Sequence, residues 1–346
     1  MILSYLGSKA TLLPYISRVI EPLIKPDTVF CDLFMGSGCV SNYFKSRVHS
    51  VIACDTELYS YVIGKALLTC PYSHKLAMII DQINLQCDGG KKGLVHANFA
   101  TGGRLYFTEE NAMRIDYMRL AIDQLYSAKL VTYSEFLFLL GSLLTSASAR
   151  ANTCGTFRAH LKTVSVKAKK QIKIVAIHKD VSILNAKCNI VKNDDAIKCS
   201  SKCITANTIV YLDPPYNSVH YGAGYSFLNY LCLYDSSVTT VGTGTMLNYN
   251  KSKFGLQKHA LAEFKSLFDA ITCRYIVMSY SSEGILHINQ IANALVYKGN
   301  VVIYKVWHKS YQTHNTGRNR LHVIEYIIVC DCDSVARKVT KTWLKL

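Results

Sequence analysis

The 346-residue chain has little acidic charge and no long apolar run. Its 39 lysines and arginines outnumber 23 acids and give a formal net charge of +16. This excess predicts a polyanionic partner, nucleic acid before an anionic membrane surface. The apolar stretch from Phe136 to Leu144 is far shorter than the roughly 20 residues that span a bilayer. The first residues lack the basic leader and apolar run of a secretory signal. We therefore expect a soluble, intracellular protein with no membrane partner.

The sequence also lacks cysteines and histidines at the spacing of metal ligands. The 13 cysteines are scattered, and the close pairs Cys199/Cys203 and Cys330/Cys332 have no matching His or Cys pair at zinc spacing. The 11 histidines form no ligand set either. We expect these thiols to be mostly small buried apolar groups, and we expect no metal. With 50% apolar and 18% charged residues, the composition excludes disorder across the whole chain.

Three zones of the chain differ in pattern. Within 28–55, a β-type run, a glycine turn, a helical run and a second β-type run follow one another. This order is a βαβ unit and predicts a parallel sheet. Residues from 208 onward again alternate strands and helices and end in an expected antiparallel pair, while 71–190 carry long helical patterns. We predict an α/β fold whose catalytic domain is split into 1–70 and 191–346, with a basic, mainly helical recognition region at 71–190 inserted.

A glycine turn with Gly36 and Gly38 follows the first expected strand. Such a turn at the carboxyl end of a parallel strand lets a ligand approach the backbone closely. Ser41 occupies the place of the third glycine of a dinucleotide fingerprint, and Asp55 ends the next strand, where an acid can hold ribose hydroxyls. Two interpretations stay open: an adenosine-type cofactor site and an ordinary tight turn.

The tetrapeptide Asp213-Pro214-Pro215-Tyr216 directly follows the expected strand TIVYL. Two prolines remove two backbone donors, so the neighbouring carbonyls are free to accept hydrogen bonds from a ligand. A carboxylate, a carbonyl and an aromatic face at a strand end suit a planar ring that carries an amino group. The alternative is a Pro-Pro turn with a surface aromatic side chain.

With these motifs the chain resembles the D12-class (Dam-like, alpha-group) DNA adenine N6-methyltransferases of the restriction–modification type. The matching blocks stand in that family's order: Tyr5-Leu6-Gly7-Ser8-Lys9, DLFMGSG, Asp55, Asp195 in NDDA, YLDPPY, YNSVHYGAGYSFLNYL and SYSSEG. The resemblance covers nearly the whole chain and is weakest at 70–105 and 160–190.

The resemblance implies a Rossmann-like, S-adenosylmethionine-dependent methyltransferase sheet with an inserted target-recognition region and no metal. It assigns cofactor binding to Tyr5, Lys9, Asp32, Phe34, Gly36, Gly38, Asp55, Asp195 and Asp213, and catalysis to Asp213, Pro214, Pro215 and Tyr216. The implied reaction is direct methyl transfer to N6 of an adenine flipped out of duplex DNA. Hydrogen bonds from the amino group to Asp213 and the Pro214 carbonyl would aim the nitrogen lone pair at the methyl group.

DNA contacts are expected from the basic parts of the chain. Residues 158–202 hold eleven lysines and arginines against three aspartates. Of these and a later loop we select Lys167, Lys169, Lys170, Lys173, Arg318 and Arg320 as candidates for double-stranded DNA. A solvated face and a plain surface hairpin are the alternatives.

The block ARANTCGTFRAHLK, which contains Asn152, is similar to one in restriction–modification relatives, some of which modify CATG. We take CATG as the candidate target and a cognate restriction endonuclease as a functional, not physical, partner. For Asn152, contact with DNA and a buried structural role both stay open.

Other functions would use the same motifs. RNA adenine N6 methylation, DNA cytosine N4 methylation and a catalytically inactive DNA-binding relative are the alternatives. An aspartate at the first position of the tetrapeptide, Asp213, favours adenine over cytosine.

Overall fold

A computed structural model describes residue 3 and residues 7–183, 188–203, 205, 207–309 and 322–345. The α-helices are α1 (Leu13–Ile20), α2 (Cys39–Phe44), α3 (Leu58–Thr69), α4 (His74–Gln86), α5 (Leu94–Phe99), α6 (Glu109–Ser127), α7 (Tyr133–Arg150), α8 (Val166–Lys169), α9 (Ala196–Cys203), α10 (Tyr221–Gly224), α11 (Ser226–Leu233), α12 (Ala260–Ala270) and α13 (Ile288–Leu295). The strands are β1 (Val29–Asp32), β2 (Ser50–Asp55), β3 (Ile190–Asn193), β4 (Thr208–Leu212), β5 (Thr240–Val241), β6 (Thr245–Met246), β7 (Tyr275–Ser281), β8 (Asn300–Lys309), β9 (His322–Asp331) and β10 (Val339–Trp343). Short 3₁₀ turns are η1 (Lys9–Thr11), η2 (Glu21–Leu23) and η3 (Lys253–Gly255).

Among the described residues, eight strands form one sheet in the order β10-β8-β9-β7-β4-β1-β2-β3. β1 lies between β2 and β4 and runs parallel to both, and β3 and β7 continue the parallel part outward. β9 is antiparallel to β7 and β8, and β10 runs parallel to β8. The predicted βαβ unit and the predicted antiparallel pair are confirmed, as is the Rossmann-like α/β fold. β10 was not expected from the sequence.

Both faces of the sheet are covered, which is why β1 and β4 read as almost unbroken apolar runs. On one face, Phe30 of β1 stacks on Phe44 of α2, with the ring centroids 4.6 Å apart. On the other face, Val210 of β4 belongs to a core with Phe264 of α12 and Ile291 of α13. Because side chains alternate along each strand, the strands contribute residues to two separate cores, one on each face of the sheet.

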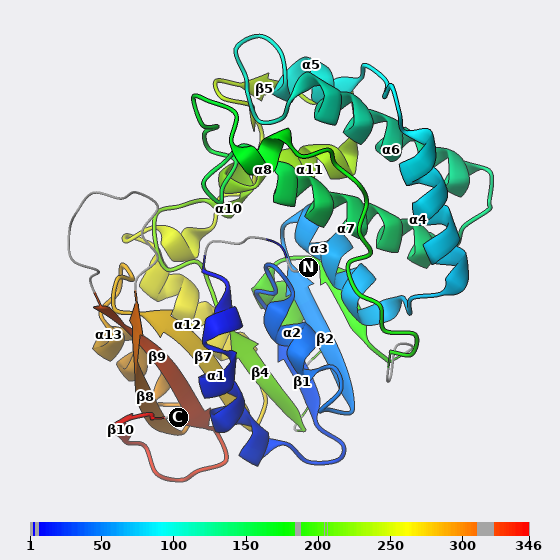
Figure 1. Ribbon diagram of the computed structural model, residues 1–346. Helices are drawn as coiled ribbons and strands as arrows, with labels where there is room; N and C mark the ends of the chain where they lie inside the picture. Colours follow the sequence, from blue (N-terminus) through cyan, green and yellow to red (C-terminus); the bar gives the residue numbers. More distant parts are fainter. Residues whose placement is uncertain are drawn as a thin grey trace.

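A helical region lies above the carboxyl end of the sheet in Figure 1, and its helix α7 packs on α3, which in turn packs on β2 and β3. We use this name for α4–α8, α10, α11 and the β5–β6 hairpin. Thr108 caps α6 as predicted, because its hydroxyl accepts a hydrogen bond from the Asn111 N–H at 3.2 Å. The region takes most of its residues from 71–190, but α10, α11 and the hairpin come from the chain after β4.

Buried charges in α6 hold the helical region together. Asp116 accepts hydrogen bonds from the N–H groups of Val95 and His96 at the start of α5, at 2.8 and 2.9 Å. Arg119 donates to the carbonyl of Leu231 in the last turn of α11 at 2.9 Å. Helix ends leave such backbone groups without intrahelical partners. The two charges thus satisfy the ends of two neighbouring helices.

Asn152 has a structural role. Its side chain is fully buried, and its Nδ2 donates to the carbonyls of Leu105, Leu161 and Thr163 at 3.0, 3.2 and 3.2 Å. Its Oδ1 accepts from the Ser165 N–H at 3.0 Å. The side-chain amide of Asn152 thus has its hydrogen-bond partners within the protein. The buried alternative that the sequence left open for Asn152 is the one observed.

Candidate active site

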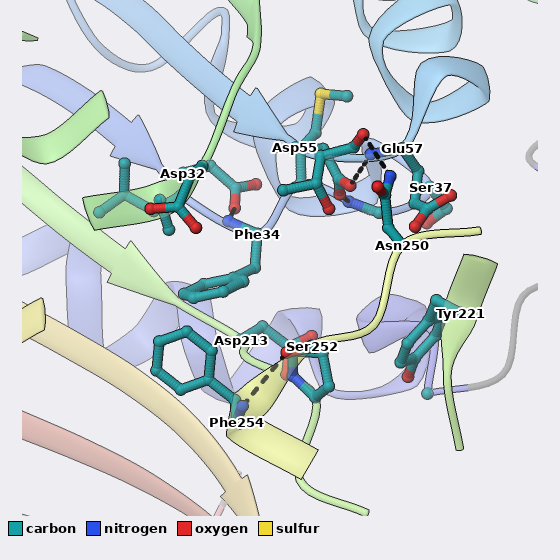
Figure 2. Close-up of a pocket in the computed structure, with 18 of the residues that line it drawn as sticks. Asp32, Phe34, Ser37, Asp55, Glu57, Asp213, Tyr221, Asn250, Ser252 and Phe254 are labelled. Carbon is teal, nitrogen blue, oxygen red and sulfur yellow. Dashed lines mark hydrogen bonds between the residues drawn. The ribbon is translucent and has the colours of Figure 1, made fainter. Parts of the chain in front are cut away.

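A cavity of about 290 Å³ opens where the carboxyl ends of β1, β2 and β4 meet. Ligands of open α/β sheets bind at this edge. Figure 2 shows Asp32 from β1, Asp55 from β2 and Asp213 after β4 around the same space. The three acids lie 181 residues apart along the chain at their extremes, and parallel pairing of the strands brings them together.

The glycine turn shapes one wall of the cavity. Gly36 and Gly38 have positive φ values of 53° and 74°, which favour glycine. A Cβ on Gly38 would lie 2.8 Å from the Cδ1 atom of Leu67. Ser41, at the place of the absent third glycine, donates its hydroxyl to Asp32 at 2.7 Å. Burial raises the pKa of Asp32 to about 7, although this hydrogen bond lowers it.

Asp55 connects the turn to the end of β2. Its two carboxylate oxygens accept hydrogen bonds from the N–H groups of Gly36 and Glu57, at 2.7 and 2.9 Å. Burial raises the pKa of Asp55, and these hydrogen bonds lower it. The carboxylate also lines the cavity.

The segment after β4 holds a buried ion pair. Lys9 is only 4% exposed, and its Nζ lies 2.7 Å from the Oδ1 atom of Asp213 and 3.0 Å from the Gly7 carbonyl oxygen. Burial lowers the pKa of Lys9, but the charges of Asp213 and Glu325 outweigh burial and the pKa is raised. Burial raises the pKa of Asp213, and Lys9 opposes that shift. Lys9 therefore stays cationic and orients the Asp213 carboxylate.

The other residues of the tetrapeptide surround this ion pair. Pro215 lines the cavity together with Asp213, whereas Pro214 is buried beside it. The Tyr216 ring lies 5.6 Å from the Nζ atom of Lys9 and contacts Tyr280 edge-on at 5.8 Å. Tyr216 is thus fixed from two sides next to Asp213.

The remaining predicted cofactor residues divide into three groups. Phe34 and Asp195 line the cavity. The Asp195 carboxylate also accepts from the Ile197 and Lys198 N–H groups at 2.9 and 3.3 Å, so it caps α9. Gly38 supports the turn just outside the lining, and Tyr5 lies outside the described residues.

The segment Asn250–Phe254, which was not predicted from the sequence, also lines the cavity (Figure 2). The Asn250 side chain donates to the Thr56 carbonyl at 3.0 Å and ties this segment to the end of β2. The rings of Phe254 and Phe34 meet edge-on with centroids 5.2 Å apart. No local pattern marks these residues, because tertiary packing alone brings them to the cavity.

Glu57 and Tyr221 were also missed. Glu57 is 4% exposed, accepts a hydrogen bond from Asn229 of α11, and lines the cavity. Burial, followed by the charge of Asp55, raises the pKa of Glu57 to about 7. Tyr221 lines the cavity from α10. Glu57 follows Asp55 by two positions and Tyr221 stands within the matched block YNSVHYGAGYSFLNYL, which is the one signal that could have found them.

The candidate DNA-binding lysines are exposed on the helical region. Lys167 donates from its Nζ to the Thr153 carbonyl at 2.9 Å. Lys169 ends α8, and Lys169, Lys170 and Lys173 are exposed, whereas Ile172 between them is buried. Arg318 and Arg320 lie outside the described residues.

None of the helices in the described part of the chain is long and apolar enough to cross a membrane. Within the same residues, no group of three or more His, Cys, Asp or Glu side chains could hold a metal ion.

Comparison with known proteins places the chain in a family. A family profile, D12 class N6 adenine-specific DNA methyltransferase, matches residues 5–294. The type II methyltransferase M.NlaIII of Neisseria lactamica is 29% identical over 327 residues, which cover 92% of this chain and 95% of that protein. M.CviAII of Paramecium bursaria Chlorella virus 1 is 34% identical over 293 residues, 82% and 85% of the two chains. M.FokI of Planomicrobium okeanokoites is 31% identical over 360 residues, 99% of this chain and 54% of that one. The chain therefore belongs to the D12 class of N6 adenine-specific DNA methyltransferases and is an enzyme of the type II modification kind.

Proposed function

We propose that the chain transfers a methyl group from S-adenosylmethionine to the N6 amino group of an adenine flipped out of duplex DNA. The observation that carries this proposal is the Asp213 carboxylate, held at 2.7 Å by the buried Lys9 at the rim of an acid-lined cavity. An exocyclic amino group is a poor nucleophile, and a fixed carboxylate can accept one of its hydrogen bonds.

S-adenosylmethionine supplies a methyl group bonded to a positively charged sulfur. The residues of the cavity fit this group: the Asp55 carboxylate would accept hydrogen bonds from ribose-type hydroxyls, and Phe34 with Phe254 offers apolar walls for a purine. The surrounding carboxylates of Asp32 and Asp213 favour positive charge in the cavity.

The tetrapeptide would bind the target base. In this proposal Asp213 and the Pro214 carbonyl accept the two amino hydrogens, and Tyr216 stacks on the ring. The base must leave the helix because its N6 atom cannot be reached inside a duplex. The exposed Lys167, Lys169, Lys170 and Lys173, together with Arg318 and Arg320, would contact the phosphates.

The test is transfer of labelled methyl from S-adenosylmethionine to unmethylated genomic DNA, with total RNA in parallel. We expect label in DNA, recovered as N6-methyladenine, and sequencing of the modified positions to show CATG. Label in RNA alone, or recovery as N4-methylcytosine, would contradict the proposed substrate. Protection of the modified DNA from a CATG-specific endonuclease would support the proposed functional pairing with a cognate restriction enzyme.

A further inference from the structure

Glu325 is a buried acid without an assigned role. It lies on β9 opposite Ser281, the last residue of β7, and is 8% exposed. Its Oε2 atom is buried and has no hydrogen-bond partner among the described residues. Buried polar atoms in proteins are nearly always paired, so an unpaired carboxylate oxygen needs an explanation.

The groups that face Glu325 belong to the catalytic centre. Lys9 and Asp213 both interact with its charge, as does Glu283 in the turn after β7, and the Ser281 hydroxyl hydrogen-bonds to it. Burial and, after it, the charge of Glu325 raise the pKa of Tyr216. Burial raises the pKa of Glu325 to about 7, while Lys9 lowers it. Near neutral pH the carboxyl group can therefore both accept and release a proton.

The proposed reaction produces one proton that must leave a closed site. The amino nitrogen uses its lone pair for the new bond to carbon, and sulfur keeps the electrons of the bond that breaks. The nitrogen then carries a positive charge and loses one proton. Asp213 is the acceptor next to it, but a protonated Asp213 could not act in the next turnover.

We propose that Glu325 receives this proton from Asp213 through Lys9. In the step, Lys9 first gives one of its protons to Glu325, which becomes neutral, and the resulting amine then takes the proton from Asp213, so Lys9 is cationic again and Asp213 is again a carboxylate. Lys9 and Asp213 are 2.7 Å apart. Lys9 and Glu325 form no direct ion pair, so a rotation of the lysine side chain or one bridging water completes the path to the unpaired Oε2. The inference rests on the proposed function.

The test is the pH dependence of single-turnover methylation by the Glu325→Gln variant. In the wild type we expect the rate to fall below about pH 7, because a protonated Glu325 cannot accept. In Glu325→Gln we expect the rate at pH 8 to be about 10²-fold lower and this acid limb to be absent. Glu283→Gln is the matched control: Glu283 is exposed and its charge raises the pKa of Glu325, so its removal should move the limb slightly to lower pH.

Two readouts separate this role from a structural one. Carbon-13 NMR of glutamate-labelled protein should show two carboxyl titrations near pH 7 in the wild type, from Glu57 and Glu325, and only that of Glu57 in Glu325→Gln. Ser281→Ala removes a hydrogen bond that lowers the pKa of Glu325, so the acid limb should move to higher pH. The second variant also serves if Glu325→Gln does not fold.

A Glu325→Gln protein with the wild-type rate and acid limb would overturn the inference and leave the proposed function standing. An unmoved limb in Ser281→Ala would overturn it too. Failure of the wild type to methylate DNA would overturn the proposed function itself and this inference with it.

Discussion

Buried charges serve different purposes at the edge of the sheet and in the helical region. In the helical region, Asp116 and Arg119 are bonded to the backbone ends of neighbouring helices. At the sheet edge, Asp32, Asp55 and Asp213 share one cavity, and Lys9 is paired directly with only one of them. Both regions bury charge, but one uses it to join elements and the other gathers it around a cavity.

Buried negative charge is therefore concentrated at the edge of the sheet, around the cavity. Buried carboxylates that lie close together have raised pKa values, as burial raises those of Asp32 and Glu57 to about 7. Such a site costs stability and favours the binding of positive charge. The cofactor of this family carries positive charge on sulfur, so the arrangement at the sheet edge is suited to ligand binding rather than to folding.

Of the changes that compare the two regions, loss of the cation at the sheet edge should have the largest effect. Lys9→Met leaves Asp213 buried without its partner. We expect methyl transfer to fall about 10²-fold, because the carboxylate is no longer positioned. The free energy of unfolding should fall by about 3 kcal/mol. Single-turnover kinetics and urea unfolding measure the two, with the exposed Lys258→Met as control. Wild-type rates in Lys9→Met would show that Asp213 needs no cation.

Removing a buried charge from the helical region should affect stability alone. Arg119→Met leaves the Leu231 carbonyl and its neighbour without their donor. We expect the free energy of unfolding to fall by about 3 kcal/mol, with unchanged cofactor affinity. Urea unfolding and calorimetric titration of S-adenosylmethionine provide the measurements. A loss of cofactor affinity in the folded variant would remove the contrast between the two regions.

The strain of crowded acids at the sheet edge should be visible in the pH dependence of stability. The pKa of Asp32 is raised to about 7 in the folded protein, above its ordinary value of 3.8. Its contribution to stability is therefore present at low pH and is lost as pH rises through about 7. Asp32→Asn should escape this loss and melt about 3 °C above the wild type at pH 8, with a smaller gap at pH 5. Equal gaps at both pH values would contradict the raised pKa.

The smallest effect concerns the surface of the helical region. Replacing Lys169, Lys170 and Lys173 by Gln should weaken binding to any duplex. The slope of log affinity against log salt should become less steep by about 0.9 for each lysine that contacts a phosphate. Fluorescence anisotropy across a salt series measures this slope. A control carries the same three changes at exposed lysines elsewhere, Lys129, Lys258 and Lys265. Equal slopes in the two triple variants would exclude the first set from the DNA interface.

Much of the candidate site could be predicted because its residues end strands. Asp32, Asp55 and Asp213 each stand at or just after the end of a short apolar run, and parallel strands end at one edge of a sheet. The fold class followed from the same βαβ pattern. The capping residue Thr108 could also be predicted, because a cap depends on local sequence.

The rest depends on contacts between distant parts of the chain. Asn250 reaches the cavity through a bond to Thr56, 194 residues away along the chain. Glu325 faces Lys9 only because β9 runs antiparallel beside β7. The second part of the helical region, from α10 to β6, is likewise placed by packing on α7 and α3. Periodicity and motif spacing contain no information about such pairings.

The role of Asp213 is decided by comparing the Asp213→Ala variant with the wild type in methyl transfer to DNA, with binding of the same duplex measured in parallel. We expect a loss of N6-methyladenine formation of at least about 10³-fold, with DNA affinity within a few-fold of the wild type. Undiminished transfer by Asp213→Ala would contradict the assignment of this carboxylate to the reacting amino group.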